Sequence, residues 1–280
     1  MPELPEVETA CRVMRRALLG KRVAEVEVVP DTIVFGGAPP EAIAGALKGH
    51  SVVDVGRRGK TWWLTTDAPG AVIGHLGMSG WIRHLGQPTI RLKEHGDAPL
   101  DDPNGRPRFL KLLITAEDGC RVALTDGRRL ARVWIAESAE KDRKIKALGP
   151  DAYDALPNGE AFARLFKARK APIKAILMDQ KILAGIGNWL ADEVLYHARI
   201  APAREAGSLS AKEYAALREQ IEVVLRTAVE LGADEHKYPK GWMFHFRWGG
   251  SRGHEMIEGR EIRREQVGGR TTAWVPSLQK

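Results

Sequence analysis

The sequence predicts an α+β fold, because helical, strand-like and again helical patterns follow one another along its 280 residues. Apolar residues recur at helical spacing over residues 5–20, alternate in short runs over residues 22–135, and return to helical spacing after residue 157. Beyond residue 237 the chain is rich in Gly, Arg and Trp and has two short β-like pieces. We therefore expect a leading helix, a mostly antiparallel β domain, a helical domain and a small hairpin.

The leading helix has a clear apolar stripe and clear ends. Acidic residues stand in its first turn and arginines in its last turns, which suits the helix dipole, and Gly20 is placed to end it. The stripe comprises Val7, Ala10, Cys11, Met14, Ala17 and Leu18. This pattern predicts an amphipathic helix over residues 5–20.

The β domain is predicted from short runs separated by Gly, Pro and Asp turns. The runs are residues 22–29, 51–55, 61–65, 71–73, 109–115, 121–124 and 132–135. Residues 87–108 carry four prolines and many charges, which indicates a long surface loop.

Domain boundaries follow from changes in composition. Two prolines fall within residues 148–157, after which helical patterns cover residues 161–170, 174–179, 189–198 and 211–231. The composition changes again near residue 237. The expected domains are therefore residues 1–150, 151–236 and 237–280.

Composition excludes several classes of protein. With 44% hydrophobic and 28% charged residues, the chain is typical of a folded globular protein and not of a disordered one. Two cysteines, Cys11 and Cys120, are too few for a disulfide framework or a four-cysteine zinc site, which favours a reducing interior. We find no membrane-length apolar run and no basic-then-apolar leader. The net charge of +7 favours a polyanionic partner.

The first residues suggest chemistry. Removal of Met1 would leave a secondary amine on Pro2, with the Glu3 carboxylate one residue away. Such an amine attacks an aldehyde carbon to give an iminium ion, and it titrates well below a lysine. The alternative is that Pro2 and Pro5 only shape the start of a helix.

Three turns of the β domain carry cationic side chains, an apolar tip or both. The first is Arg57-Arg58-Gly59-Lys60, where cations before a strand suit phosphate contacts. The second, residues 75–80, places Met78 between glycines, and the third, residues 125–130, presents Arg128 and Arg129 beside Leu130. The third turn suits a wedge into a base stack, and a solvated hairpin tip is its alternative. The second is a projecting turn with an apolar tip, and its alternative is a core position for Met78.

The helical region and the tail add further candidates. Glycines at residues 185 and 187 let backbone N–H groups at a helix start approach a phosphate. Positive charge lies upstream, at Lys167, Arg169, Lys170 and Lys174. Arg270 follows two glycines at an expected hairpin tip.

In this order, these pieces resemble the formamidopyrimidine-DNA glycosylase and endonuclease VIII family of base-excision repair enzymes over essentially the whole length. The resemblance rests on Pro2-Glu3-Leu4-Pro5-Glu6-Val7-Glu8 and on Gly185-Ile186-Gly187-Asn188-Trp189-Leu190-Ala191-Asp192-Glu193. It implies an N-terminal β-sandwich, a helix-two-turn-helix domain, a finger, and action as a monomer on damaged double-stranded DNA.

The resemblance also implies roles for individual residues. Pro2 is expected to attack the sugar C1′ and Glu3 to act as acid and base, with Glu6 in the lesion pocket. Met78 and Arg128 are expected to fill the gap in the duplex, flanked by Arg129 and Leu130. The expected phosphate contacts are Lys60, His75, Lys170, Asn188 and Arg270, and Lys60 and Arg270 also count among the catalytic set.

The sequence departs from the family pattern at the finger. Most members carry a four-cysteine zinc site there, but this chain has no cysteine after Cys120. The tail resembles the zincless finger of the plant branch, so we expect no zinc and no other cofactor, with packing of Trp248 and Trp274 replacing coordination.

Two further departures bear on the substrate. Leu130 stands where purine-lesion enzymes usually have phenylalanine, and the segment after residue 231 is short. We expect strong action on formamidopyrimidines and hydantoins and weak action on 8-oxoguanine. We also expect an intracellular, DNA-associated protein, in the cytoplasm and nucleoid or in a nucleus. An oxidised-pyrimidine preference, as in endonuclease VIII, and a catalytically inactive damage binder remain alternatives.

Overall fold

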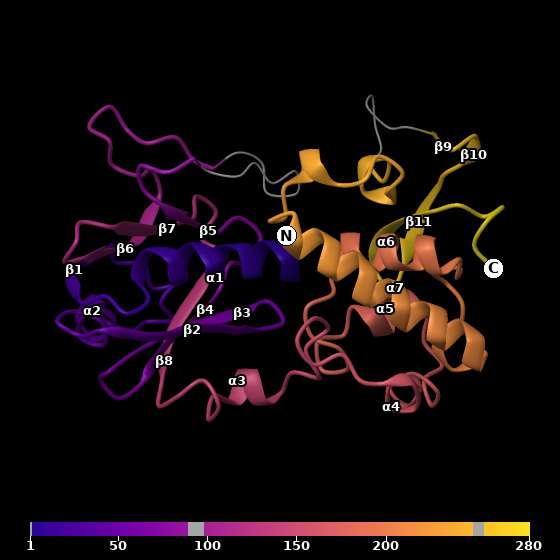
Figure 1. The fold of residues 1–280 in the computed structure, drawn as a ribbon, viewed down its shortest axis with the longest axis horizontal. Coiled ribbons are helices and arrows are strands. Elements are labelled where there is room, and N and C mark those ends of the chain that lie inside the picture. Colours follow the sequence, from indigo (N-terminus) through magenta and orange to yellow (C-terminus); the bar gives the residue numbers. More distant parts are fainter. Residues whose placement is uncertain (1, 89–97, 249–254) are drawn as a thin grey trace. The chain divides into compact units, whose positions relative to one another are not determined.

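The computed structural model describes residues 2–88, 98–248 and 255–280. They form two compact units, one of Met1–Ala147 with Gly232–Glu235 and one of Leu148–Leu231 with His236–Lys280. Figure 1 traces both units along the chain. Met1, the middle of the expected surface loop and Gly249 of the tail lie outside the described residues.

The first unit contains two four-stranded antiparallel sheets. In spatial order, one sheet consists of β1 (Val23–Val28), β6 (Leu110–Ala116), β7 (Arg121–Thr125) and β5 (Trp81–His84). The other consists of β2 (Val52–Arg58), β3 (Thr61–Thr66), β4 (Ala71–His75) and β8 (Arg132–Ala136). Apolar side chains of both sheets share one buried core, so the expected sandwich is confirmed.

Helix α1 (Leu4–Leu18) completes this core. It contacts β5 and β7 of one sheet and β2 and β3 of the other. Every residue of its predicted apolar stripe is buried in the shared core. The sequence did not reveal the short helices α2 (Pro40–Gly45) and α3 (Arg143–Lys146) or strand β5, whose three buried residues in a row break the alternation expected of a strand.

The predicted surface loop carries little regular structure where it is described. Residues 87–88 and 98–108 contain no helix or ladder strand, and one isolated bridge joins Asp101 to Pro107. Arg83 of β5 ties the loop down through an ion pair of 2.8 Å with Asp101.

The second unit begins with helices. They are α4 (Gly159–Arg164), α5 (Ile173–Leu177), α6 (Asn188–Ala198) and α7 (Ala211–Glu230), with the 3₁₀ turns η1 (Ala206–Ser208) and η3 (Met243–His245). A further 3₁₀ turn, η2 (Glu235–Lys237), begins at the last residue of the first unit. Helix α7 starts at a capping box, in which Ser210 and Glu213 bond each other's backbone N–H groups. Three helices match their predicted ranges closely, and α4 is shorter than predicted.

Two hairpins follow the helices. Strands β9 (Met256–Ile257) and β10 (Arg260–Glu261) form a short one, and β11 (Arg263–Val267) pairs with β12 (Arg270–Trp274) in the longer one. The predicted hairpin is therefore present. Within the described ranges, no helix combines the length and apolarity that crossing a membrane requires.

Candidate functional site

Pro2 and Glu3 lie at the start of α1. Both are buried, and 1% of Glu3 is exposed. The Glu3 backbone N–H donates to the Glu6 carboxylate over 3.0 Å, so the acidic residue in the first turn fixes the chain that carries Pro2. Pro5 stands inside the first helical turn, as the simpler interpretation of the motif expects.

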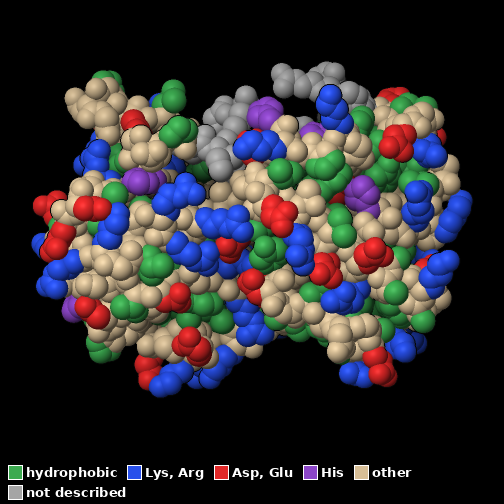
Figure 2. Space-filling view, in the orientation of Figure 1, with side chains coloured by type: hydrophobic (Ala, Val, Ile, Leu, Met, Phe, Trp, Pro, Cys, Tyr) green, Lys and Arg blue, Asp and Glu red, His purple; other side chains and the backbone are tan. Residues whose placement is uncertain are grey.

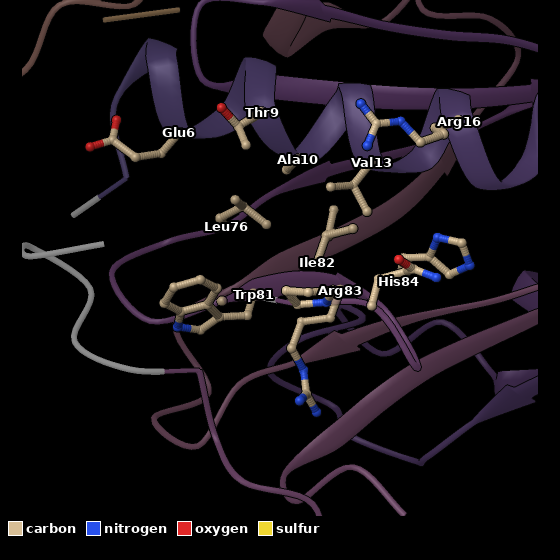
Figure 3. A pocket seen from close by; sticks show the side chains of 13 residues that line it. Glu6, Thr9, Ala10, Val13, Arg16, Leu76, Trp81, Ile82, Arg83 and His84 are labelled. Atoms are coloured by element: carbon tan, nitrogen blue, oxygen red, sulfur yellow. The ribbon is translucent and has the colours of Figure 1, made fainter. Parts of the chain in front are cut away.

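Glu6 also lines a cavity of about 430 Å³ in the first unit. Figure 3 shows that α1 forms one side and the Leu76–His84 region the other, with Glu6 at one end and His84 towards the other. The lining between these ends is mainly apolar, with Val13, Leu76 and Trp81 among its members. Glu6 thus offers a carboxylate at the edge of an apolar pocket.

Lys60 lies in the tight turn between β2 and β3. Arg58 pairs with Thr61, which leaves Gly59 and Lys60 as a two-residue turn, and Gly59 has a φ of 58°. A left-handed first turn position favours glycine. Lys60 is 6% exposed.

Arg57 binds another part of the protein, although its neighbours in the sequence suggested a phosphate contact. Its side chain is 1% exposed and forms an ion pair of 2.9 Å with Glu8 of α1. Glu8 also binds Arg15 over 2.9 Å. Arg57 therefore connects the strand to the helix and is not one of the surface cations of this segment.

His75 lies beside Lys60 because Thr61 pairs with His75 across β3 and β4. The Gly77 N–H donates to His75 Nδ1 over 2.9 Å, so the neutral ring carries its proton on Nε2. Burial, and then the positive charges of Lys60, Arg132 and Lys144, lower the His75 pKa from 6.5 to about 4. Near neutral pH this side chain is an uncharged donor.

Two turns of the first unit lie against each other. We name residues 76–80 the Met78 turn and residues 126–131 the Arg128 turn. Met78 is 45% exposed, and Arg128 is exposed. Gly77 has a φ of 64°, and a Cβ there would stand 2.2 Å from the Leu130 carbonyl oxygen. The structure thus brings together the two expected apolar and cationic tips, with Leu130 half-buried between them.

Arg129 is bound to the protein itself. It has a φ of 57°, and its guanidinium donates to both oxygens of Asp31 over 3.0 and 3.1 Å. Asp31 also accepts from Lys111 over 2.8 Å. Burial alone would raise the Asp31 pKa, but bonds from Arg129, Lys111 and backbone N–H groups hold it well below its usual range. Arg128 and Arg129 are therefore not equivalent.

In the second unit, Asn188 is the first residue of α6 and is half-buried. The loop before it is held by Gln180, whose carboxamide accepts from Gly185 N–H over 2.9 Å and donates to the Ile186 carbonyl over 2.7 Å. Lys170 is exposed, as are Lys167 and Arg169.

Arg270 is exposed at the first position of β12. Val267 pairs with Arg270, and the intervening Gly268 and Gly269 have φ values of 59° and 75°. Positive φ at both central positions is the requirement of a type I′ turn. A Cβ on Gly268 would stand 2.7 Å from the Ala175 Cβ, so this turn packs directly on α5.

A buried ionic cluster holds the same hairpin, and the sequence did not reveal it. Asp192 of α6 pairs with Lys174 over 2.6 Å and with Arg247 over 2.9 Å. Lys174 also donates to the Thr271 carbonyl and the Thr272 hydroxyl, over 3.1 and 2.7 Å. Lys174 is fully buried, so the expectation that it adds surface charge was wrong. Its place among Ile173, Ile176 and Leu177 was the available signal.

The two tryptophans expected to hold the hairpin have separate surroundings. Trp248 meets the Phe244 ring edge-on at 6.4 Å and donates to the Phe244 carbonyl over 3.1 Å. The Arg263 guanidinium stands 5.7 Å from the Trp274 ring. Among the described residues, no three His, Cys, Asp or Glu side chains are grouped to hold a metal ion.

Basic side chains are spread over the surface of both units. Figure 2 shows Lys and Arg interspersed with acidic residues on the face drawn. This distribution accompanies the net charge of +7 and offers several places for phosphate contacts.

Comparison with known proteins finds related sequences over the full chain. Residues 1–133 match "Formamidopyrimidine-DNA glycosylase N-terminal domain" and residues 148–239 match "Formamidopyrimidine-DNA glycosylase H2TH domain". The formamidopyrimidine-DNA glycosylase of Arabidopsis thaliana is 37% identical over 280 residues, covering 100% of this chain and 71% of that protein. The Xanthomonas campestris enzyme is 31% identical over 289 residues and covers both chains fully.

Solved structures share the fold. Lactococcus lactis formamidopyrimidine-DNA glycosylase, bound non-covalently to DNA with an AP site, has a TM-score of 0.80 and 26% identity. A structure of MutM with carbocyclic 8-oxo-G containing DNA has a TM-score of 0.79 and 25% identity. Both alignments cover 100% of each chain.

Proposed function

The chain belongs to the formamidopyrimidine-DNA glycosylase family, and from this premise we propose that it is a DNA glycosylase of base-excision repair with abasic-site lyase activity. Its substrate is damaged double-stranded DNA, on which it acts as a single chain. The observation that carries the proposal is the N-terminal motif, in which Pro2 and Glu3 precede α1 and the Glu6 carboxylate accepts from the Glu3 backbone N–H.

Pro2 is the proposed nucleophile once Met1 has been removed. Its amine nitrogen forms a bond to the sugar C1′, the bond from C1′ to the base breaks, and the base leaves with a proton. Glu3 is the proposed acid and base that assists opening of the sugar ring. Because a secondary amine gives a permanently cationic iminium, it acidifies the C2′ hydrogens.

The iminium accounts for the lyase activity. Loss of a C2′ proton expels the 3′ phosphate, and a second elimination expels the 5′ phosphate, leaving a one-nucleotide gap. No external oxidant or reductant is needed, because each step moves only protons and leaving groups. Lys60 belongs to this proposed catalytic set, together with Arg270.

Eversion of the damaged base is assigned to both units. A base inside a duplex must leave the stack at a cost of about a few kcal/mol. We assign Met78 and Arg128 to the gap, with Leu130 beside them and Arg129 fixing the Arg128 turn. The proposed phosphate contacts are Lys60 and His75 in the first unit, and Lys170, Asn188 and Arg270 in the second.

Glu6 supports a specific place for the everted base. It combines a position beside Glu3 with the edge of the 430 Å³ cavity. We propose formamidopyrimidines and hydantoins as preferred lesions and 8-oxoguanine as a poor one. The short segment from the end of α7 at Glu230 to η3 at Met243 supports this order, because little chain is available there to cover a base.

The finger is proposed to work without zinc. The chain's two cysteines, Cys11 and Cys120, belong to the first unit, so the hairpin has no thiolate to offer a metal. The ion cluster around Asp192 supplies an alternative support for the turn that carries Arg270. The proposed domain division at residues 150 and 236 treats this hairpin as a separate finger.

The proposed substrate places the protein inside the cell with its DNA, in a nucleoid or a nucleus.

Borohydride trapping tests the proposal. Protein with a free Pro2 should form a covalent complex with duplex DNA that contains a formamidopyrimidine or an abasic site. Pro2→Gly replaces the secondary amine by a primary one, and an added residue before Pro2 blocks it. Loss of the complex in the blocked protein is expected. Intact DNA binding with no trapped complex from the free protein would instead indicate a damage binder.

A further inference from the structure

Asp126 lies between the two turns that carry Met78 and Arg128. It follows β7 directly and is 0% exposed. Its Oδ1 accepts from the Ser79 hydroxyl over 2.6 Å and from the Arg128 N–H over 3.0 Å. Its Oδ2 accepts from the Ala131 N–H over 2.6 Å. One buried carboxylate thus bonds both turns.

The bond to Ser79 differs in kind from the other two. Arg128 and Ala131 belong to the same turn as Asp126, whereas Ser79 lies 47 residues away in the Met78 turn. Hydrogen bonds to a charged group are stronger than neutral ones, and removing one partner from a buried carboxylate is costly. The Ser79 bond therefore links the Met78 turn to the Arg128 turn. A solvated hairpin tip would have no such bond to another turn.

Close backbone packing reinforces this bond. A Cβ on Gly77 would stand 2.2 Å from the Leu130 carbonyl oxygen, and one on Gly80 would stand 3.2 Å from the Ala131 Cβ. The turns therefore approach as closely as their backbones allow. The Arg128 turn is also fixed on its other side, because Arg129 holds Asp31.

We propose that Asp126 is a positioning residue that joins the Met78 turn and the Arg128 turn into one rigid wedge. Met78 and Arg128 then enter the duplex together, because neither turn moves without the other. The inference rests on the proposed function, since a wedge matters only if a base is everted. Asp126 itself contacts neither the base nor the sugar.

A rigid wedge should matter for duplex DNA and not for single-stranded DNA. In a duplex, the space left by the everted base must be filled and the opposite base held. A single-stranded abasic oligonucleotide has no opposite base and no such space, yet it presents the same sugar to Pro2. A loose wedge should therefore slow the reaction on duplex DNA and leave trapping on single-stranded abasic DNA unchanged.

Two variants loosen the wedge in different ways. Asp126→Asn has one acceptor oxygen in place of two, so it cannot accept both from Ala131 on one side and from Ser79 and Arg128 on the other. Ser79→Ala removes only the bond between the turns and serves if Asp126→Asn fails to fold. For either variant we expect the single-turnover rate on duplex lesions to fall about tenfold, as for the loss of one bond to a charged group. Ser79→Thr keeps the hydroxyl and should restore the rate.

The other end of β7 provides the matched control. Asp118 accepts the N–H of Cys120, two residues on, over 3.1 Å, just as Asp126 accepts that of Arg128. Its side chain is 48% exposed and bonds Lys21. Asp118→Asn should leave the rates on both substrates unchanged.

A double-mutant cycle tests the rigid link itself. In the unsubstituted protein, the effects of Met78→Ala and Arg128→Ala on the duplex rate should not add, because each removes part of the same rigid wedge. In the Ser79→Ala background they should add, because the turns are then independent.

Every outcome of the rate and trapping measurements either supports or overturns the inference. Duplex-specific slowing in Asp126→Asn or Ser79→Ala supports the inference. Unchanged duplex rates in both variants, or equal losses on duplex and single-stranded DNA, would overturn it while the proposed function stands. If the unsubstituted protein traps neither substrate, the proposed function fails, and this inference fails with it.

Discussion

Arg128 and Arg270 both stand exposed on tight turns, but the two turns are held in different ways. The Arg128 turn is fixed by Asp126. This carboxylate accepts three hydrogen bonds, and two of them come from backbone N–H groups within five residues along the chain. The Arg270 turn is fixed from outside by Lys174, which bonds Thr272 across 98 residues, and by the packing of Gly268 on α5.

The difference shows how side chains from other elements can support a small hairpin. An isolated two-stranded hairpin is marginal in water. The β11–β12 hairpin gains support from buried charges on α5 and α6, whereas the Arg128 turn extends from a sheet that already has a core. The hairpin should therefore depend more strongly on a few distant side chains.

The largest test of this comparison is Asp192→Asn. This change leaves two buried cations, Lys174 and Arg247, without the carboxylate that pairs with both. Loss of one partner from a buried ion pair typically costs roughly 3–5 kcal/mol. We expect the free energy of unfolding, measured in urea, to fall by about this amount.

Glu222→Gln is the exposed counterpart of that change. Glu222 also pairs with two arginines, Arg218 and Arg226, each over 3.1 Å, but its side chain is 44% exposed. The expected loss is less than about 1 kcal/mol. Equal losses in the two variants would mean that the buried cluster does not support the hairpin.

On the side of the Arg128 turn, Gly77→Ala is the next largest change. It adds left-handed strain at a φ of 64° to a collision with the Leu130 carbonyl oxygen. Together these cost roughly 2–4 kcal/mol. Gly119→Ala, at a φ of 84° with open space around it, measures the strain alone and should cost about 1–2 kcal/mol. Urea unfolding compares both variants, and similar losses would show that the two turns do not need their close approach.

Arg270→Ala separates the two exposed arginines by their effect on DNA binding. If Arg270 contacts a phosphate, its loss should weaken duplex binding about tenfold and reduce the salt slope of log K by about 1. Arg128→Ala should change opposite-base discrimination and leave that slope unaltered.

The same binding assay tests the proposed zincless finger. A chelator should leave both affinity and activity unchanged, because the hairpin is held by Asp192 and its partners. Loss of activity after chelation, restored by zinc, would refute that support.

A last test concerns His75, whose ring accepts a backbone hydrogen bond. Its pKa is lowered from 6.5 to about 4, so the unfolded chain binds the proton more readily than the folded protein. The contribution of the neutral His75 to stability is therefore fully present above pH 6.5, and it is lost as the pH falls towards 4. Urea midpoints across this window should fall less in His75→Gln. His236→Gln, at an exposed histidine, should follow the unsubstituted protein, and a His75→Gln profile that does so too would exclude this effect.

The sequence alone predicted most of the elements. The apolar stripe defined α1, and alternation defined seven of the eight sandwich strands, although it missed β5. Gly268 and Gly269 predicted the hairpin turn, because two consecutive left-handed positions favour glycine. The motif that starts at Pro2 predicted the family.

Only the tertiary structure decided which cationic side chains pair with carboxylates of the protein itself. Arg57, Arg129 and Lys174 look like surface cations in the sequence, yet each pairs with a carboxylate of the protein. The physical reason is that periodicity and turn chemistry depend on neighbours within a few residues. An ion pair depends on a partner that folding brings near, such as Glu8 for Arg57, 49 residues away, or Asp31 for Arg129, 98 residues away.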